Sequence, residues 1–238
     1  MQQYFLARHA FVCTIGPDVI VLDLRRDEYF SFEREFWEPI ARMIGIAGTQ
    51  AIPDGATDGE PGDAADAGAL EQLLERGLLT EDGSDGKDAS PATIELPCQS
   101  MMEDFRARRP AIRVGHILVF LGAIVTALFR RRFQPMEKIV ASVTRHRQRE
   151  HQDADPSRTR DLTEIFRRLR PLLFTSRDQC VLESLMLIHF LAHYRVHPSW
   201  VFGVQTMPFL AHCWLQQGPV ACNDTLDYLR RYTPIMVA

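Results

Sequence analysis

The sequence predicts an α+β protein built from two modules, and the evidence is an uneven distribution of charge and a change in the secondary-structure pattern. Residues 1–100 contain 7 Lys and Arg against 19 Asp and Glu, a net charge of −12, whereas residues 101–238 contain 20 against 12, a net charge of +8. Strand patterns precede helical ones in the first part, and a polar Gly/Asp/Ser-containing stretch separates it from the second. We therefore expect a domain at residues 1–82, a linker at 83–100 and a second domain at 101–238.

Composition narrows the class of protein. The chain has 238 residues, of which 46% are hydrophobic and 24% charged, as is usual for globular proteins. The first residues lack the basic and apolar regions of a secretory signal, and the five cysteines show no paired metal spacing. We therefore expect a cytoplasmic protein with no metal site.

The first module begins with three predicted strands. β-rich segments occupy residues 10–15, 19–24 and 29–32, with turn residues between them. A helix should follow, because Phe36, Trp37 and Ile40 have helical spacing, although Pro39 predicts a kink or a late helix start.

A second helix completes this module. Residues 45–68 are rich in Gly, Ala and Asp and are predicted as a loop. Leu70, Leu73 and Leu74 then form one helix face, and Gly77 marks the helix end. Three strands plus helices define a small α+β or winged-helix-like module.

The second module contains a long apolar segment at residues 114–129, flanked by arginines. A helix of that length spans about 24 Å, which is shorter than the roughly 30 Å core of a bilayer. We therefore expect a buried or partner-facing helix and no membrane span, while the flanking arginines leave a membrane-surface role open. The basic segment from 145 to 160 is predicted as a solvated loop, and its lack of interleaved aromatic residues argues against nucleic-acid binding.

Cys180 stands at the predicted start of another apolar helix. Thr175, Ser176 and Asp178 precede it and are helix-starting residues. In the first turn, the helix dipole and free N–H groups favour the thiolate and can hold a developing oxyanion. The alternative interpretation is a buried cysteine that only packs.

His212 and Asp224 are the predicted partners of Cys180. Residues 200–205 and 211–216 have strand patterns, and Gly218-Pro219 is a turn signal. If the hairpin is centred on Gly218, His212 and Asp224 lie opposite each other, so that the carboxylate can orient the ring. The alternatives are a strand histidine bonded to backbone and an aspartate that caps the last helix. Asp227 does not satisfy this register.

Three further residues are excluded from the predicted site. His189 and His193 are four residues apart on the apolar helix, but Phe190 stands where the zinc-protease signature requires Glu. We expect both to be core or interface histidines with satisfied hydrogen bonds. Cys213 should point away from the His212 face of its strand.

These residues resemble those of the lasso peptide leader peptidases. The resemblance consists of Cys180 at a helix start, the segment A-H-C-W at 211–214, and N-D at 223–224 followed by R-R-Y-T-P-I. It covers roughly residues 101–238 and implies a transglutaminase-like, papain-like cysteine protease fold. It also implies removal of a leader peptide, with Cys180 as nucleophile, His212 as base and acid, and Asp224 as the orienting group.

The first module resembles the precursor recognition element of peptide-modifying enzymes, which is similar to the small peptide chaperone of pyrroloquinoline quinone biosynthesis. Such domains bind a leader peptide as an added strand beside their third strand. The resemblance implies leader contacts from eight residues: Tyr29, Phe30, Ser31, Phe32, Leu70, Leu73, Leu74 and Arg76. Ordinary core packing is the alternative for the aromatic residues and leucines.

The same resemblance implies partners and a nucleotide. The partners are a lasso precursor peptide and a lasso cyclase similar to asparagine synthetases. Leader peptidases that carry the recognition element and the peptidase in one chain are also linked to ATP. The sequence, however, contains no G-x-x-x-x-G-K phosphate loop. Two other functions use the same residues differently: acyl transfer to an amine, as in transglutaminases, and non-catalytic delivery of a precursor.

Overall fold

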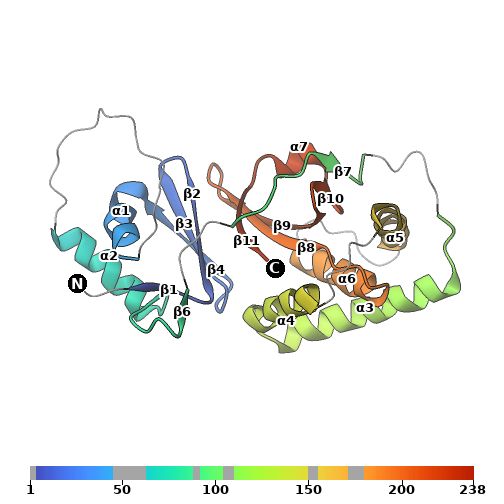
Figure 1. The fold of residues 1–238 in the computed structure, drawn as a ribbon, viewed down its shortest axis with the longest axis horizontal. Helices are drawn as coiled ribbons and strands as arrows, with labels where there is room; N and C mark the ends of the chain where they lie inside the picture. Colours follow the sequence, from blue (N-terminus) through green and yellow to red (C-terminus); the bar gives the residue numbers. More distant parts are fainter. Residues whose placement is uncertain (1–3, 45–62, 88–91, 104–109, 150–154, 171–179) are drawn as a thin grey trace. The chain divides into compact units, whose positions relative to one another are not determined.

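The computed structural model describes residues 4–44, 63–87, 92–103, 110–149, 155–170 and 180–238, and it is drawn in Figure 1. The chain divides into two compact units, Met1–Thr93 and Ile94–Ala238. The division falls inside the segment predicted as a linker. Two short strands of that segment are paired in sheets, β6 (Gly86–Lys87) in the first unit and β7 (Gln99–Ser100) in the second.

The first unit contains an antiparallel meander of three strands. These are β2 (Ala10–Ile15), β3 (Asp18–Asp23) and β4 (Glu28–Glu33), in the order β2-β3-β4. Gly16 adopts a φ of +57° between β2 and β3, a conformation that favours glycine in a tight hairpin. A second sheet has the order β5-β1-β6 and contains β1 (Phe5–Ala7) and β5 (Leu79–Thr80). The winged-helix likeness of this unit stays a prediction.

Two helices close the core of the first unit, of which the first packs on the meander and the second packs on the first helix and on β5. α1 (Arg34–Met43) begins before Pro39, so the predicted late start is wrong; the helix follows β4 directly, and the Arg34 N–H donates to the Pro17 carbonyl at 2.8 Å. α2 (Asp63–Glu75) includes residues 63–68, which were predicted as loop, while residues 45–62 lie outside the described part of the chain. Trp37 and Leu73 are buried in this core.

The second unit has a five-stranded sheet with the order β11-β8-β9-β10-β7. β7 and β10 (Val220–Ala221) are parallel, and the other neighbours are antiparallel. The remaining strands are β8 (Ser199–Gln205), β9 (Leu210–Gln217) and β11 (Thr233–Val237). The predicted strands at 200–205 and 211–216 are therefore confirmed.

Five helices accompany this sheet in the described residues of the unit. They are α3 (Val114–Phe133), α4 (Met136–Arg149), α5 (Pro156–Leu169), α6 (Cys180–His193) and α7 (Leu226–Leu229). α6 packs against β9, and α3 and α5 pack against α6 (Figure 1). The two ends of the basic segment at 145–160 are therefore helical where a loop was predicted, and its residues 150–154 lie outside the described part of the chain. Asp155 accepts a hydrogen bond from the Ser157 N–H at 2.9 Å and caps α5.

α3 buries only one of its faces. The buried residues of α3 are Phe120, Ala123, Ile124 and Ala127, whereas many of its large apolar side chains are exposed. The helix is therefore only partly buried, although its apolar composition would permit full burial. By length and composition α3 could cross a membrane, and 22% of its apolar window is buried. Core helices of soluble proteins pass the same test, so this finding is weak evidence for a span.

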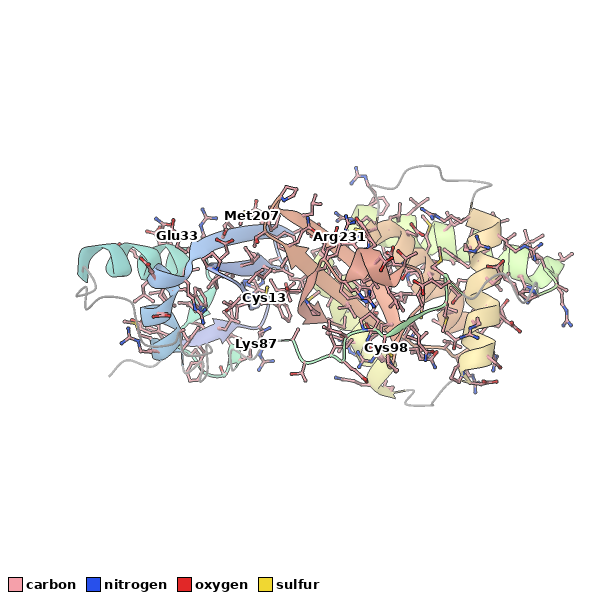
Figure 2. All side chains as sticks on the ribbon, turned by 90° about the horizontal axis from the view of Figure 1, so that it is seen from above. Cys13, Glu33, Lys87, Cys98, Met207 and Arg231 are labelled. Atoms are coloured by element: carbon pink, nitrogen blue, oxygen red, sulfur yellow. The ribbon has the colours of Figure 1, made fainter. Side chains whose placement is uncertain are left out.

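All five cysteines are free, and they differ in exposure. Cys13 is buried in β2, whereas Cys98 is exposed just before β7; both are labelled in Figure 2. Cys180 is half-buried, and Cys213 and Cys222 are buried. Exposure thus separates Cys98 and Cys180 from thiols that are closed to solvent.

Candidate active site

Cys180 is the first residue of α6 in the described part of the chain. The helix is apolar on nearly every side, and Leu185, Leu187 and Leu191 are fully buried in the unit's core. Because these leucines are buried, α6 is held against the sheet, and this packing sets the position of Cys180 relative to β9. The predicted helix-starting residues Thr175, Ser176 and Asp178 lie outside the described residues.

His212 and Asp224 are in direct contact. His212 Nε2 and Asp224 Oδ2 are 2.7 Å apart, and both side chains are largely buried, with 13% and 23% exposed. A carboxylate accepts hydrogen bonds, so Nε2 carries the proton and Nδ1 is left for a second partner. The predicted pairing of ring and carboxylate is therefore present.

The contact arises differently from the predicted strand register. Val220 pairs with Gln217 and Ala221 with Gln216, one residue away from the register that would place His212 opposite Asp224. β10 ends at Ala221, so Asp224 is not a cross-strand neighbour at all. The chain bends back after β10, and this bend carries the carboxylate to the ring.

Two side chains hold the bend that presents Asp224. The Asn223 amide oxygen accepts a hydrogen bond from the Leu215 N–H at 2.7 Å. The buried Ser100 of β7 donates its hydroxyl to the Asp224 carbonyl at 2.5 Å. Ser100 is 124 residues from Asp224 along the chain, so no local pattern in the sequence could reveal its role.

Cys213 lies against the same face of α6 as Cys180. Ser184 is four residues after Cys180 and therefore shares its face of the helix. The Ser184 hydroxyl lies 3.4 Å from the Cys213 carbonyl oxygen and 3.7 Å from the Cys213 sulfur. The prediction that Cys213 points away from the His212 face agrees with this arrangement, but its exclusion from the site is wrong, because the helix brings Cys180 to it.

The electrostatics of the site favour a thiolate on Cys180. A hydrogen bond with the Cys213 thiol lowers the pKa of Cys180, burial opposes this, and the hydrogen bond and charge of His212 lower it further, to about 4. Burial lowers the pKa of His212, but hydrogen bonds to Asp224 and Cys180, and the charges of both, raise it to about 9. Between these two pKa values the pair is a thiolate and an imidazolium.

Aromatic side chains surround the imidazole ring. The centroids of Tyr228 and Tyr232 lie 5.0 and 5.3 Å from that of His212, and the two tyrosine hydroxyls are 3.0 Å apart. Trp214 stacks along the strand at 6.3 Å from His212. Gly203 lies opposite His212 on β8, where an added Cβ would be only 2.8 Å from the Trp214 ring. The ring is thus held in place by packing as well as by Asp224.

The predicted leader-binding residues lie on β4, α2 and the turn after α2. β4 is an edge strand of its sheet, with β3 on one side. Successive strand residues alternate between faces, so Phe30 and Phe32 share the face that packs on the core, while Tyr29 and Ser31 lie on the other. These four residues therefore share the backbone edge of β4, but their side chains do not form one surface.

The predicted leader-binding residues on α2 and in the turn after it also differ in burial. Leu70 and Leu74 are partly buried against the core, and the Arg76 guanidinium lies 4.5 Å from the centroid of the Phe30 ring. Leu73 is 1% exposed and is a core residue. The structure therefore brings Phe30, Leu70, Leu74 and Arg76 to one side of the unit and leaves Leu73 beneath them.

The two other histidines of α6 are apart from this site. His193 is exposed and packs edge-on against Tyr194, with ring centroids 5.0 Å apart. His189 Nε2 is buried with no hydrogen-bond partner among the described residues, so the expectation of satisfied hydrogen bonds is wrong for this side chain. The described residues contain no group of three or more His, Cys, Asp or Glu side chains placed to hold a metal ion.

A comparison with known families agrees with this geometry. Residues 120–237 match the family described as the transglutaminase-like superfamily. No curated protein and no solved structure matches the chain. The second unit therefore contains a transglutaminase-like domain, which confirms that part of the predicted fold. Members of this superfamily are usually cysteine proteases or transglutaminases, so the domain is suited to attack on an acyl group by a cysteine.

Proposed function

We propose that this protein is a cysteine peptidase that removes the leader from a lasso precursor peptide. The observation that carries the proposal is the convergence of Cys180, His212 and Asp224, with the pKa of Cys180 lowered to about 4 and that of His212 raised to about 9. A nucleophile and an acid are then both in their reactive states at neutral pH. The family match supports acyl chemistry, and the lasso substrate is inferred from the resemblance described above.

The mechanism follows from the protonation states. The Cys180 thiolate attacks the carbonyl carbon of the leader–core bond, and the His212 imidazolium donates its Nδ1 proton to the departing amine. The core peptide leaves with a free amino group, and the leader stays as a thioester on Cys180. His212 then takes a proton from water, and the resulting hydroxide releases the leader as a carboxylate. Asp224 holds Nε2–H throughout and stabilises the imidazolium.

The first unit is proposed to bind the leader. β4 is an edge strand of its sheet, a place for strand addition, and Phe30, Leu70, Leu74 and Arg76 are partly exposed apolar and cationic side chains that accompany it. The lasso cyclase would receive the released core peptide, and ATP and a cytoplasmic location belong to the same proposal. Because Leu73 is buried, it supports this surface from below and does not touch the leader.

The test is cleavage of a lasso precursor by the full-length protein, followed by mass spectrometry. The precursor should have a threonine near the end of its leader, which the resemblance indicates as a recognition point. We expect Cys180→Ala to abolish cleavage and to leave binding of a fluorescent leader unchanged. Cys98→Ala is the matched control, because Cys98 is an exposed thiol in the same unit. Full cleavage by the Cys180 variant would refute the assignment of the nucleophile.

The match to the transglutaminase-like superfamily also favours a second function, acyl transfer to an amine. The thioester on Cys180 would then be attacked by an amine instead of water. Mass spectrometry with an added primary amine separates the two outcomes, because transfer leaves the amine bound to the leader. Binding of the leader with neither product, in the presence of ATP and the cyclase, would indicate a precursor-delivery scaffold instead.

A further inference from the structure

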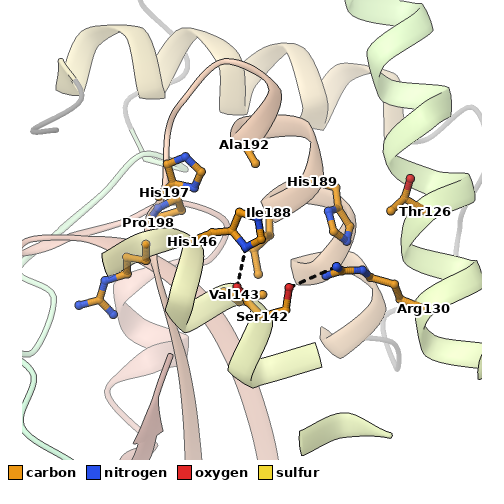
Figure 3. Close-up of a pocket in the computed structure, with 11 residues that line it drawn as sticks. Thr126, Arg130, Ser142, Val143, His146, Ile188, His189, Ala192, His197 and Pro198 are labelled. Carbon is orange, nitrogen blue, oxygen red and sulfur yellow. Dashed lines mark hydrogen bonds between the residues drawn. The ribbon is translucent and has the colours of Figure 1, made fainter. Parts of the chain in front are cut away.

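A cavity of about 220 Å³ lies among three helices of the second unit, away from the candidate active site (Figure 3). α3, α4 and α6 supply most of its walls, and the segment after α6 closes one side. Val143, Ile188, Ala192 and Pro198 form apolar parts of the lining. His189 is nine residues after Cys180, and at about 100° per residue it lies on the opposite side of α6.

The polar groups of the cavity are all cationic or neutral. The described lining residues include no Asp or Glu, whereas basic side chains come from every wall: Arg130, His146, Arg147, His189 and His197. The Arg130 guanidinium donates a hydrogen bond to the Ser142 hydroxyl at 3.2 Å, which holds it at the cavity wall (Figure 3). Arg147 donates to the Ala238 carbonyl at 2.9 Å. Arg130 is therefore a cation fixed at the cavity by a neutral group.

Two histidines lie close to this guanidinium. His146 Nδ1 is 2.7 Å from the Ser142 carbonyl oxygen, so Nδ1 carries a proton and Nε2 is left over. His189 Nε2 is buried without a hydrogen-bond partner in the described structure. Burial, and after it the positive charges of Arg130 and His146, lower the pKa of His189 to about 4. At neutral pH His189 is therefore uncharged, and Arg130 is the fixed cation beside it.

We propose that this cavity is a binding site for a small oxyanion, a carboxylate or phosphate group carried on a compact apolar body. The oxyanion would accept hydrogen bonds from the Arg130 guanidinium and from the Nε2–H of His189, and the apolar walls would hold its body. The orphaned nitrogen of His189 would then have a partner, and the Arg130 guanidinium would have an anionic one. The absence of a metal-binding group among the described residues argues against a cation as the ligand.

This site is separate from the proposed peptidase chemistry. None of its lining residues belongs to the Cys180–His212–Asp224 set. Its test is a binding measurement on the full-length protein and needs no substrate. The result is therefore independent of whether the protein cleaves a leader.

The experiment is calorimetric titration with inorganic phosphate and, separately, with benzoate, in chloride buffer of constant ionic strength. We expect saturable 1:1 binding of at least one probe, tighter at pH 6 than at pH 8, because binding protonates His189. Phosphate binding identifies a phosphate ligand, and benzoate binding identifies a carboxylate. Histidine NMR should show that the pKa of His189 rises when the probe is bound.

Arg130→Gln and Arg132→Gln are matched variants on α3. Arg130 lines the cavity and Arg132 does not. We expect the first to weaken binding by about tenfold or more, as loss of a charge-assisted hydrogen bond should, and the second to leave it unchanged. His189→Asn is the second variant and should abolish the pH dependence. Equal weakening by both arginine variants, or no saturable binding of either probe, would overturn the proposal.

Discussion

The carboxylate of Asp224 should control the protonation of His212, and Asp224→Asn tests this directly. The substitution removes the negative charge but keeps an oxygen that can accept the Nε2–H bond, so the ring should keep its orientation. We therefore expect the pKa of His212 to fall while the fold is unchanged. The thiolate–imidazolium pair should then persist over a narrower range of pH.

The size of the effect follows from the structure. The difference between the ordinary histidine pKa of 6.5 and about 9 is worth roughly 3 kcal/mol. The hydrogen bonds to Asp224 and Cys180 raise this pKa most and the charge of Asp224 comes next, so that charge accounts for only part of the difference. Losing about 1.4 kcal/mol lowers the His212 pKa by about one pH unit. Both side chains are less than a quarter exposed, so solvent screening reduces this only slightly.

Histidine NMR titration of the full-length protein measures this pKa, and leader cleavage gives a second measurement. A raised histidine pKa means that the imidazolium is present below it and is lost as pH rises through it. Cleavage by Asp224→Asn should therefore fall by about threefold at pH 8.5 and hardly at all at pH 6.5. Asp227→Asn is the control, because Asp227 is 90% exposed. An unchanged His212 pKa in the Asp224 variant would refute the reasoning.

Two further predictions concern the packing around the site. Cys213→Ala should raise the pKa of Cys180, so that iodoacetamide alkylates Cys180 several times more slowly at pH 5 but equally fast at pH 8. Cys213→Ser keeps a hydrogen-bond donor and should restore the alkylation rate. Identical pH profiles for the Cys213→Ala variant and the unchanged protein would contradict the role of Cys213. Gly203→Ala should lower the free energy of unfolding by roughly 1–3 kcal/mol, because the new Cβ would lie against the Trp214 ring, as thermal melting can show. Gly115→Ala is its control, since no atom lies within 4 Å of that added Cβ, and equal melting temperatures would count against the overpacking argument.

Local sequence patterns determined the secondary structure of most segments. The three strands of the meander, the apolar helix after Cys180 and the strand containing His212 all occur where hydrophobic periodicity and turn residues predicted them, whereas the short strands β1, β5 and β6 were not predicted. The errors lie where local signals conflict. Proline inside α1 suggested a late start, but the helix begins directly after β4, and the charged segment at 145–160 read as a loop although Asp155 caps a helix there.

The meeting of His212 with Asp224 shows what the sequence determined and what it did not. Residue types and spacing identified the two side chains, because an imidazole and a carboxylate on either side of a turn are a recognisable pair. The register used to join them was one residue wrong, and the contact depends on a bend held by Asn223 and Ser100. Strand pairing is set by the whole sheet, so a hairpin in isolation cannot specify it.

The sequence by itself indicated two modules, most of their longer helices and strands, and the thiol, imidazole and carboxylate of the candidate site. Only the tertiary structure decided that Cys213 stands beside Cys180, that Ser100 anchors Asp224, and that basic side chains from several elements line one cavity whose described lining holds no Asp or Glu. The physical reason is that periodicity reports which face of an element is apolar. Contacts between residues far apart in the chain depend instead on how whole elements pack against one another.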